Sequence, residues 1–138
     1  FGLEKNVKLL GIVKRDEISE FLSSLDIYVQ ASVSEGSPIT IKEAMAASLP
    51  ILSTKVGGIP EMITDEITGI LVPHDDQDKF IDALIKLINM NVAHREKMGK
   101  DAYNYAIKNY SMELLAKKNA AIYYKQYREN KKNYYNLV

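Results

Sequence analysis

Apolar residues along the chain follow two patterns. Short runs rich in β-branched residues lack clean alternation, which is typical of parallel strands buried on both faces. Longer segments carry apolar residues every three or four positions, as one face of a helix does. The predicted strands are residues 7–13, 26–31, 50–54 and 69–73, and the predicted helices are residues 15–25, 38–47, 75–89, 93–109 and 112–130.

This alternation of strands and helices predicts an α/β fold with a doubly wound parallel sheet, followed by C-terminal helices. We expect an α/β domain over residues 1–110 and a C-terminal helix and tail over residues 111–138, with the tail frayed beyond Arg128. Ligands of such sheets bind beyond the carboxyl ends of the strands, in loops that lead into helices. Two loops of this kind stand out, SEGSP at residues 34–38 and KVGGIPE at residues 55–61.

The composition narrows the classes of function. The 138 residues suffice for one domain, and their formal net charge of zero gives no overall field that would attract nucleic acid. The charge is uneven, however, with 10 Lys+Arg against 15 Asp+Glu in residues 1–99 and 8 against 3 in residues 100–138. The absence of cysteine excludes disulfides, thiolate metal sites and cysteine nucleophiles. No apolar run approaches a membrane span and no signal-peptide pattern is present, so we expect a cytoplasmic protein.

The SEGSP loop predicts an anion site. Ser37 is expected to cap a helix that begins at Pro38, because serine accepts from first-turn amides and proline fits the first helical position. The free amides and positive dipole end of such a helix suit a phosphate. Glu35 lies just outside that end, within reach of a group attached to the phosphate.

A second carboxylate lies about two turns into the same helix. Glu43 faces away from the core stripe, so it can accept hydrogen bonds from vicinal hydroxyls such as those of a ribose. A phosphate site with a carboxylate at each end is therefore suited to a nucleotide-sugar. The spacing alone leaves the alternative open that Glu35 is a solvated turn residue and Glu43 an ordinary surface residue of a helix. The stripe is formed by Ile41, Ala44, Met45 and Ser48.

The stretch EGSPITIKEAMA, residues 35–46, resembles the E-x7-E element of retaining glycosyltransferases with the GT-B fold, the group 1 or family 4 class. The flanking stretches LGIV, SLDIYVQAS and LPILSTKVGGIPEMITDEITGILVPHDD resemble the family in the same order, over roughly residues 1–110. The resemblance implies a Rossmann-like sheet, the C-terminal half of a GT-B fold. It also implies a hexosyltransferase whose donor is linked to UDP or GDP and which needs no metal ion.

The same resemblance assigns roles to individual residues. Glu35 would be the catalytic residue near the donor sugar ring, where it supports the hydroxyls and the charge that develops at the anomeric carbon. Glu43 would hold the ribose hydroxyls. The remaining donor-binding residues would be Gly36, Ser37 and Ile39, through their backbone amides, and Val13 and Lys14, near the base.

Three positions depart from the family pattern. Gly36-Ser37-Pro38 replaces the usual Gly-Phe-Gly, so one N–H that could contact the sugar is lost at the proline. Ser48 stands where the family commonly has glycine, at a cost of about 1 kcal/mol if a left-handed conformation is needed. Asp65-Glu66 replaces a typical Asp-Gly turn.

Other conspicuous residues have simpler interpretations. Gly57 and Gly58 either let the backbone approach a ligand or make a tight turn. His74 and His94 have no partner at metal spacing, and the aspartates of residues 75–78 are expected to begin a helix. The tyrosines of the basic C-terminal third are expected to pack the last helices against the sheet or another domain. The alternative that they touch the inner face of a membrane stays open. They are Tyr103, Tyr105, Tyr110, Tyr123, Tyr124, Tyr127, Tyr134 and Tyr135.

The resemblance also suggests what lies outside this chain. GT-B enzymes close an acceptor domain and a donor domain around a cleft, and the opening strand of the donor domain carries a basic clamp for the diphosphate. We therefore interpret the chain as a donor-binding fragment, incomplete at its N-terminus and inactive alone, of a bacterial enzyme of polysaccharide biosynthesis whose acceptor is a glycan or a lipid-linked saccharide. The alternatives are a non-catalytic nucleotide-sugar-binding module and a GT-B sugar-nucleotide epimerase.

Overall fold

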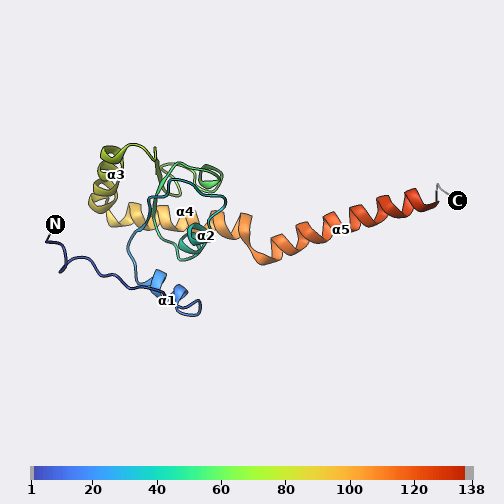
Figure 1. Cartoon of the computed structure of the whole chain (residues 1–138), viewed down its shortest axis with the longest axis horizontal. Coiled ribbons are helices and arrows are strands. Elements are labelled where there is room, and N and C mark those ends of the chain that lie inside the picture. The colour runs from blue at the N-terminus through green and yellow to red at the C-terminus, as the bar shows by residue number, and fades with distance from the viewer. Residues whose placement is uncertain (1, 136–138) are drawn as a thin grey trace.

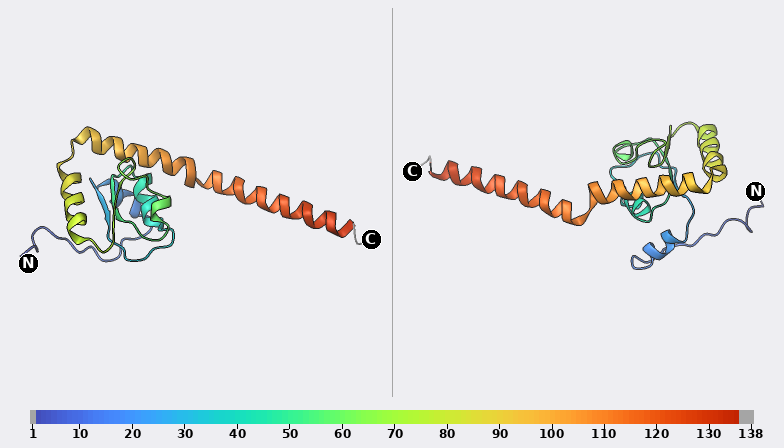
Figure 2. Two further views of the ribbon diagram at one scale, coloured as in Figure 1. Left: turned by 90° about the horizontal axis from the view of Figure 1, so that it is seen from above. Right: turned by 180° about the vertical axis from the view of Figure 1, so that it is seen from behind.

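Three short parallel strands and the helices around them form the body of the protein, and a long C-terminal helix projects from it (Figures 1 and 2). The computed structural model describes residues 2–135. The elements are α1 (Ile18–Ser23), β1 (Tyr28–Gln30), α2 (Ile39–Ala46), β2 (Ile51–Thr54), the 3₁₀ helix η1 (Ile59–Glu61), β3 (Ile70–Val72), α3 (Gln77–Asn89), α4 (Val92–Tyr110) and α5 (Met112–Tyr135).

The sheet has the order β1-β2-β3 and is parallel throughout. All four residues of the central strand β2 are buried, and neighbouring side chains enter different cores. Ile51 packs in a cluster with α1 and α2, whereas Leu52 packs in a cluster with β3 and α3. Helices therefore cover both faces of the sheet, which confirms the predicted α/β fold.

Helix α4 joins the two cores. Met98, in its first half, belongs to the cluster of β3 and α3, while Ala102 and Ala106 belong to the cluster of α1 and α2. Gly99 lies so close to the end of α2 that a Cβ there would be 1.9 Å from the carbonyl oxygen of Ser48. Any side chain at this position would push α4 away from the end of α2.

The strand predicted at residues 7–13 is wrong. These residues run outside the sheet toward the N-terminus (Figure 1), and the side chains of Leu9 and Ile12 are 93% and 97% exposed. Gly11 has a φ of 68°, a left-handed conformation that a regular strand does not use. Residues 7–13 have the composition of a strand. A strand also needs a neighbouring strand to pair with its backbone amides, and composition alone does not indicate one.

Helix α3 begins where the sequence predicts, whereas α5 ends later than predicted. Asp76 accepts from the Lys79 amide at the start of α3, which confirms the helix start predicted for the aspartates, and Ser111 accepts from the Leu114 amide at the start of α5. The predicted fraying beyond Arg128 is wrong, because α5 continues to Tyr135. Residues 136–138 of the predicted tail lie outside the described residues. No helix in the described part of the chain combines the length and apolarity that crossing a membrane requires.

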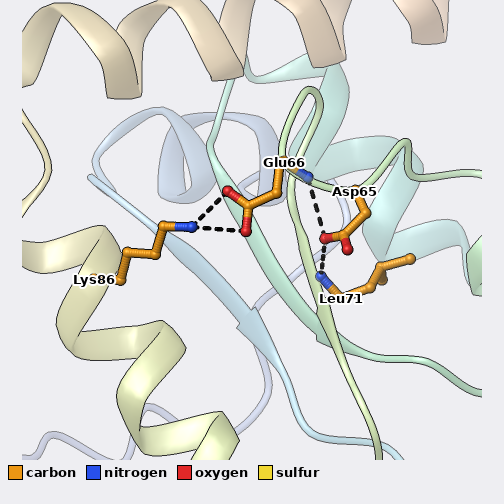
Figure 3. A network of polar contacts seen from close by, with 4 residues as sticks. All are labelled: Asp65, Glu66, Leu71 and Lys86. Carbon is orange, nitrogen blue, oxygen red and sulfur yellow. Dashed lines mark hydrogen bonds and ion pairs between the residues drawn. The ribbon is translucent and has the colours of Figure 1, made fainter.

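The turn before β3 holds Glu66 in a left-handed conformation, and polar contacts surround Asp65 and Glu66 (Figure 3). Glu66 has a φ of 62°, so the turn needs the conformation that glycine adopts without cost. The Asp65 carboxylate accepts from the amides of Glu66 and Leu71, at 3.1 and 2.9 Å, and the Glu66 carboxylate pairs with Lys86 of α3 at 2.6 Å. These bonds offset the strain of a non-glycine residue.

Candidate functional site

Helix α2 begins beside the loop that the sequence singles out. The predicted cap is wrong, because Pro38, with a φ of −62° and a ψ of 126°, is the capping residue and the first helical residue is Ile39. Ser37 precedes the cap, and its hydroxyl accepts from Lys42 Nζ at 2.9 Å. Within the described part of the chain no side chain caps this helix, so its first amides remain free for an anion.

Glu35 is half-buried and held by hydrogen bonds. Its Oε1 accepts from Gln30 Nε2 and from Ser32 Oγ, both at 2.8 Å. Gln30 is the last residue of β1, and the Ser32 carbonyl accepts in turn from Thr54 Oγ1 at the end of β2. The carboxylate is therefore fixed to the carboxyl ends of two strands rather than free in solvent.

The glycines of the second loop pack directly beneath the first. A Cβ on Gly57 would lie 1.6 Å from the carbonyl oxygen of Glu35, and a Cβ on Gly58 would lie 2.2 Å from that of Gly36. Gly57 also has a φ of 52°, which favours glycine. The close approach that the sequence suggested is thus made to the protein's own backbone, and it sets the position of residues 35 and 36.

Glu43 lines a cavity of about 260 Å³ between α1 and α2. Arg15 brings a cation to the same cavity, Ile18 and Leu22 bring apolar surface, and Ser19 brings a hydroxyl. Glu35 does not belong to the lining of this cavity. The two glutamates therefore lie at separate places, Glu35 just before the start of α2 and Glu43 along its side.

The predicted base-contacting residues lie at the entrance to α1. Val13 is half-buried and Lys14 is exposed, and both directly precede Arg15 of the cavity. The other predicted donor-binding positions, Gly36, Ser37 and Ile39, are all exposed at the start of α2. Of the seven predicted residues, two precede α1, four lie around the start of α2, and Glu43 lies along the side of α2.

Two tyrosines of α4 brace the other side of α2. Tyr105 and Tyr110 meet edge to face with ring centroids 6.0 Å apart, and the Lys42 ammonium lies 5.3 Å from the Tyr110 centroid. The Tyr105 hydroxyl donates to the Glu61 carbonyl at 3.0 Å. Burial, with Tyr105 and Glu61 nearby, raises the pKa of Tyr110 to about 12. This packing confirms the structural interpretation for two tyrosines, whereas three on α5 are exposed, Tyr123, Tyr124 and Tyr127.

Sequence reasoning missed the polar residues that support Glu35. Gln30, Ser32 and Thr54 carry no motif, and their only signal is a polar side chain at the end of an otherwise apolar strand. As for metals, the described residues contain no group of three His, Cys, Asp or Glu side chains arranged to hold an ion.

Comparison with known proteins gives consistent results. The family described as "Glycosyl transferases group 1" matches residues 1–105. N-acetyl-alpha-D-glucosaminyl L-malate synthase of Bacillus anthracis is 33% identical over 129 residues, which cover 94% of this chain and 33% of that protein. The chain thus spans about a third of the length of this curated relative.

Two solved structures are similar as well. The C-terminal domain of a glycosyl transferase group 1 family protein (LpcC) of Francisella tularensis is 32% identical, with a TM-score of 0.72 over 80% of this chain and 57% of that one. Anabaena HepE in complex with UDP-glucose is 21% identical, with a TM-score of 0.81 over 90% of this chain and 34% of that one. At that identity the likeness to HepE shows the fold alone.

Proposed function

This chain belongs to the group 1 family of glycosyltransferases, as a C-terminal domain of the GT-B type, and we propose that it binds the nucleotide-sugar donor for a retaining hexosyl transfer. The observation that carries the proposal is the arrangement around α2. A held carboxylate, Glu35, precedes an uncapped helix start, and a second carboxylate, Glu43, lines a cavity along the side of the same helix. Those are the parts needed for a sugar, a diphosphate and a nucleoside.

The nucleoside is proposed to occupy the cavity between α1 and α2. Glu43 accepts hydrogen bonds from the ribose hydroxyls, since a carboxylate can pair with two neighbouring donors. The apolar side chain of Ile18 offers a surface for the base, and Val13 and Lys14 approach it from the chain leading to α1. The UDP-glucose held by HepE, a protein of this fold, supports a nucleotide-sugar as the ligand.

The diphosphate is proposed to meet the start of α2. The amides of Gly36, Ser37 and Ile39 are available there, while Pro38 has no N–H to offer. Free amides and the helix dipole stabilise the negative charge that the diphosphate gains as its bond to the anomeric carbon breaks. We propose that this stabilisation lets the transfer proceed without a metal ion.

Glu35 is proposed as the catalytic residue. Its carboxylate supports the sugar hydroxyls and the positive charge that develops at the anomeric carbon as the diphosphate departs. An acceptor hydroxyl then bonds to the anomeric carbon on the face that the diphosphate left and gives its proton to the departing diphosphate. Attack on that face retains the configuration. The acceptor is proposed to be a glycan or a lipid-linked saccharide.

The partner of this domain is proposed to be an acceptor-binding domain, with UDP- or GDP-linked sugars as donors and no nucleic acid. The exposed apolar residues of α5 support a covering partner, because a lone helix with this much apolar surface gains stability from burial. We propose a cytoplasmic location, with the basic, tyrosine-bearing α5 as the segment that would approach the inner membrane face.

Calorimetric titration of the chain with UDP-glucose and GDP-mannose tests the proposal. We expect binding of one of the two, and a loss of about tenfold or more in affinity in Glu43→Ala, because a hydrogen bond to a charged group contributes about 1.5–3 kcal/mol. Glu113→Ala, on the exposed start of α5, is the matched control and should bind as the unaltered chain does. A folded chain that binds neither donor contradicts the proposal.

A further inference from the structure

Gln30 is the centre of a polar network that ends on the proposed catalytic carboxylate. Its Nε2 donates to Glu35 Oε1 at 2.8 Å and to Ser32 Oγ at 3.2 Å. Its Oε1 accepts from Tyr28 Oη at 2.9 Å and from Thr40 Oγ1 at 3.0 Å. An amide side chain has two N–H donors and an oxygen that accepts two bonds, so every hydrogen-bonding position of Gln30 is used.

The direction of this network is set by Glu35. An ionised carboxylate only accepts, so the nitrogen of Gln30, and not its oxygen, must face it. With the nitrogen fixed there, the oxygen points back to Tyr28 and Thr40, which act as donors. The reverse orientation of the amide would place two acceptors against each other and leave the nitrogen facing two hydroxyls.

The backbone brings these residues together for local reasons. Tyr28, Gln30 and Ser32 alternate along β1 and its continuation, so their side chains share one side of the strand. Thr40 lies in the first turn of α2, directly after the uncapped helix start. Gln30 therefore ties Glu35 to both the strand and the helix that flank the proposed diphosphate position.

The hydrogen bonds leave the second carboxylate oxygen available. Both bonds to the Glu35 side chain converge on Oε1, and Oε2 has no hydrogen-bond partner within the described part of the chain. A carboxylate anchored through one oxygen presents the other in a fixed direction, which lowers the entropy lost when a ligand hydroxyl binds to it.

We propose that Gln30 is a positioning residue for the donor sugar, which it serves by anchoring Glu35 Oε1 so that Oε2 meets a sugar hydroxyl. The inference rests on the proposed function and adds a residue to it. Other side chains do not reproduce the role. Asparagine does not span the same distances, glutamate lacks the N–H donors, and methionine has no donor and only a weakly accepting sulfur.

Affinity for the donor with and without its sugar separates this role from a structural one. We expect Gln30→Met to weaken UDP-glucose binding, or GDP-mannose binding if the chain prefers guanine, by about three- to tenfold. The affinity for UDP or GDP should change less than about twofold, because a nucleotide without the sugar does not contact Glu35. Gln30→Glu should weaken the sugar nucleotide further, since it sets two carboxylates together. Gln126→Met on exposed α5 is the control.

The outcomes separate the proposed role of Gln30 from the proposed function of the chain. Equal losses for the sugar nucleotide and the bare nucleotide, or no loss for either, overturn the role of Gln30 while the proposed function stands. An unaltered, folded chain that binds none of these four nucleotides overturns both.

A measurement without ligand covers the case in which the substituted chain is unstable. In the unaltered sequence the side-chain amide resonances of Gln30 report its bond to Glu35, so Glu35→Asp, which withdraws the carboxylate, should shift them and leave those of Gln126 in place. Gln30 resonances that do not move would overturn the anchoring, and with it the inference.

Discussion

The amide of Gly58 donates a hydrogen bond to the carbonyl oxygen of Gly36 over 2.9 Å. This bond joins the loop after β2 to the loop after β1, at the edge of the sheet where ligands of this architecture bind. A Cβ on Gly58 would lie 2.2 Å from the same oxygen, so the loops are as close as two backbones without side chains can be. The position of Glu35 therefore depends on glycine in the neighbouring loop.

Gly58→Ala should disturb the candidate site and the fold together. The added methyl group must displace the Gly36 carbonyl, because the obstructing atom is backbone rather than a flexible side chain. We expect a loss of about 1–3 kcal/mol in the free energy of unfolding, as for other overpacked positions. Urea denaturation measures it.

Gly36→Ala supplies the matched control for that experiment. A Cβ at Gly36 meets no atom within 4 Å, so the same substitution in the other loop should leave the stability nearly unchanged. Equal stability of the two variants would show that the loops are not packed as described.

Ser48→Gly should stabilise the protein. Ser48 follows α2 with a φ of 59°, and the amide of Leu49 reaches back to the Ala44 carbonyl at 3.1 Å, as in helix ends that favour glycine. Glycine removes the cost of the left-handed conformation, so we expect a gain of about 1 kcal/mol. Thermal and urea unfolding of the variant measure the gain.

The adjacent residue gives the opposite expectation. Ala47 has a φ of −81°, where glycine has no conformational advantage, so Ala47→Gly should lower the free energy of unfolding by about 0.5–1 kcal/mol. A loss of stability in both variants would contradict the account of this helix end.

Tyr110 should ionise at a higher pH than an ordinary tyrosine, so the stability of the protein should fall at alkaline pH. Its pKa of about 12 lies above the usual value of 10.0, because burial favours the neutral phenol in the folded state. The stabilising contribution is complete below pH 10 and declines as the pH rises toward 12. Ultraviolet titration of tyrosinate should show an ionisation step near pH 12 that Tyr110→Phe removes and Tyr103→Phe leaves in place.

Several features of the fold could be predicted because their signals are local. The buried strand β2 is apolar without alternation, since both of its faces are covered. Three members of the predicted stripe, Ile41, Ala44 and Met45, are buried. The fourth, Ser48, was wrongly placed in the stripe, because α2 ends at Ala46 and Ser48 is exposed beyond it. The left-handed conformation of Ser48, with a φ of 59°, is anticipated by the family resemblance rather than by a local signal, because the family commonly has glycine at this position.

Other features depend on contacts that a single sequence does not show. Residues 7–13 resemble a strand, but a strand also needs a paired neighbour, and periodicity says nothing about one. The sequence predicts Ser37 as the cap of α2, but the capping residue is Pro38, because the proline backbone is extended there. Gln30 supports Glu35 through a side-chain hydrogen bond that spacing along the chain does not indicate. Gly58 stands out in the sequence, but its partner, the Gly36 carbonyl, is seen only in the folded structure.

The most direct test of the central claim is a backbone amide NMR titration of the chain with UDP, GDP and ADP, repeated on Glu43→Ala. The account predicts that one nucleotide shifts amides at residues 13–18 and 35–43, around the start of α2 and its cavity, and that Glu43→Ala weakens the response. Shifts confined to other surfaces, or a response that Glu43→Ala does not alter, would contradict the assignment of the donor site.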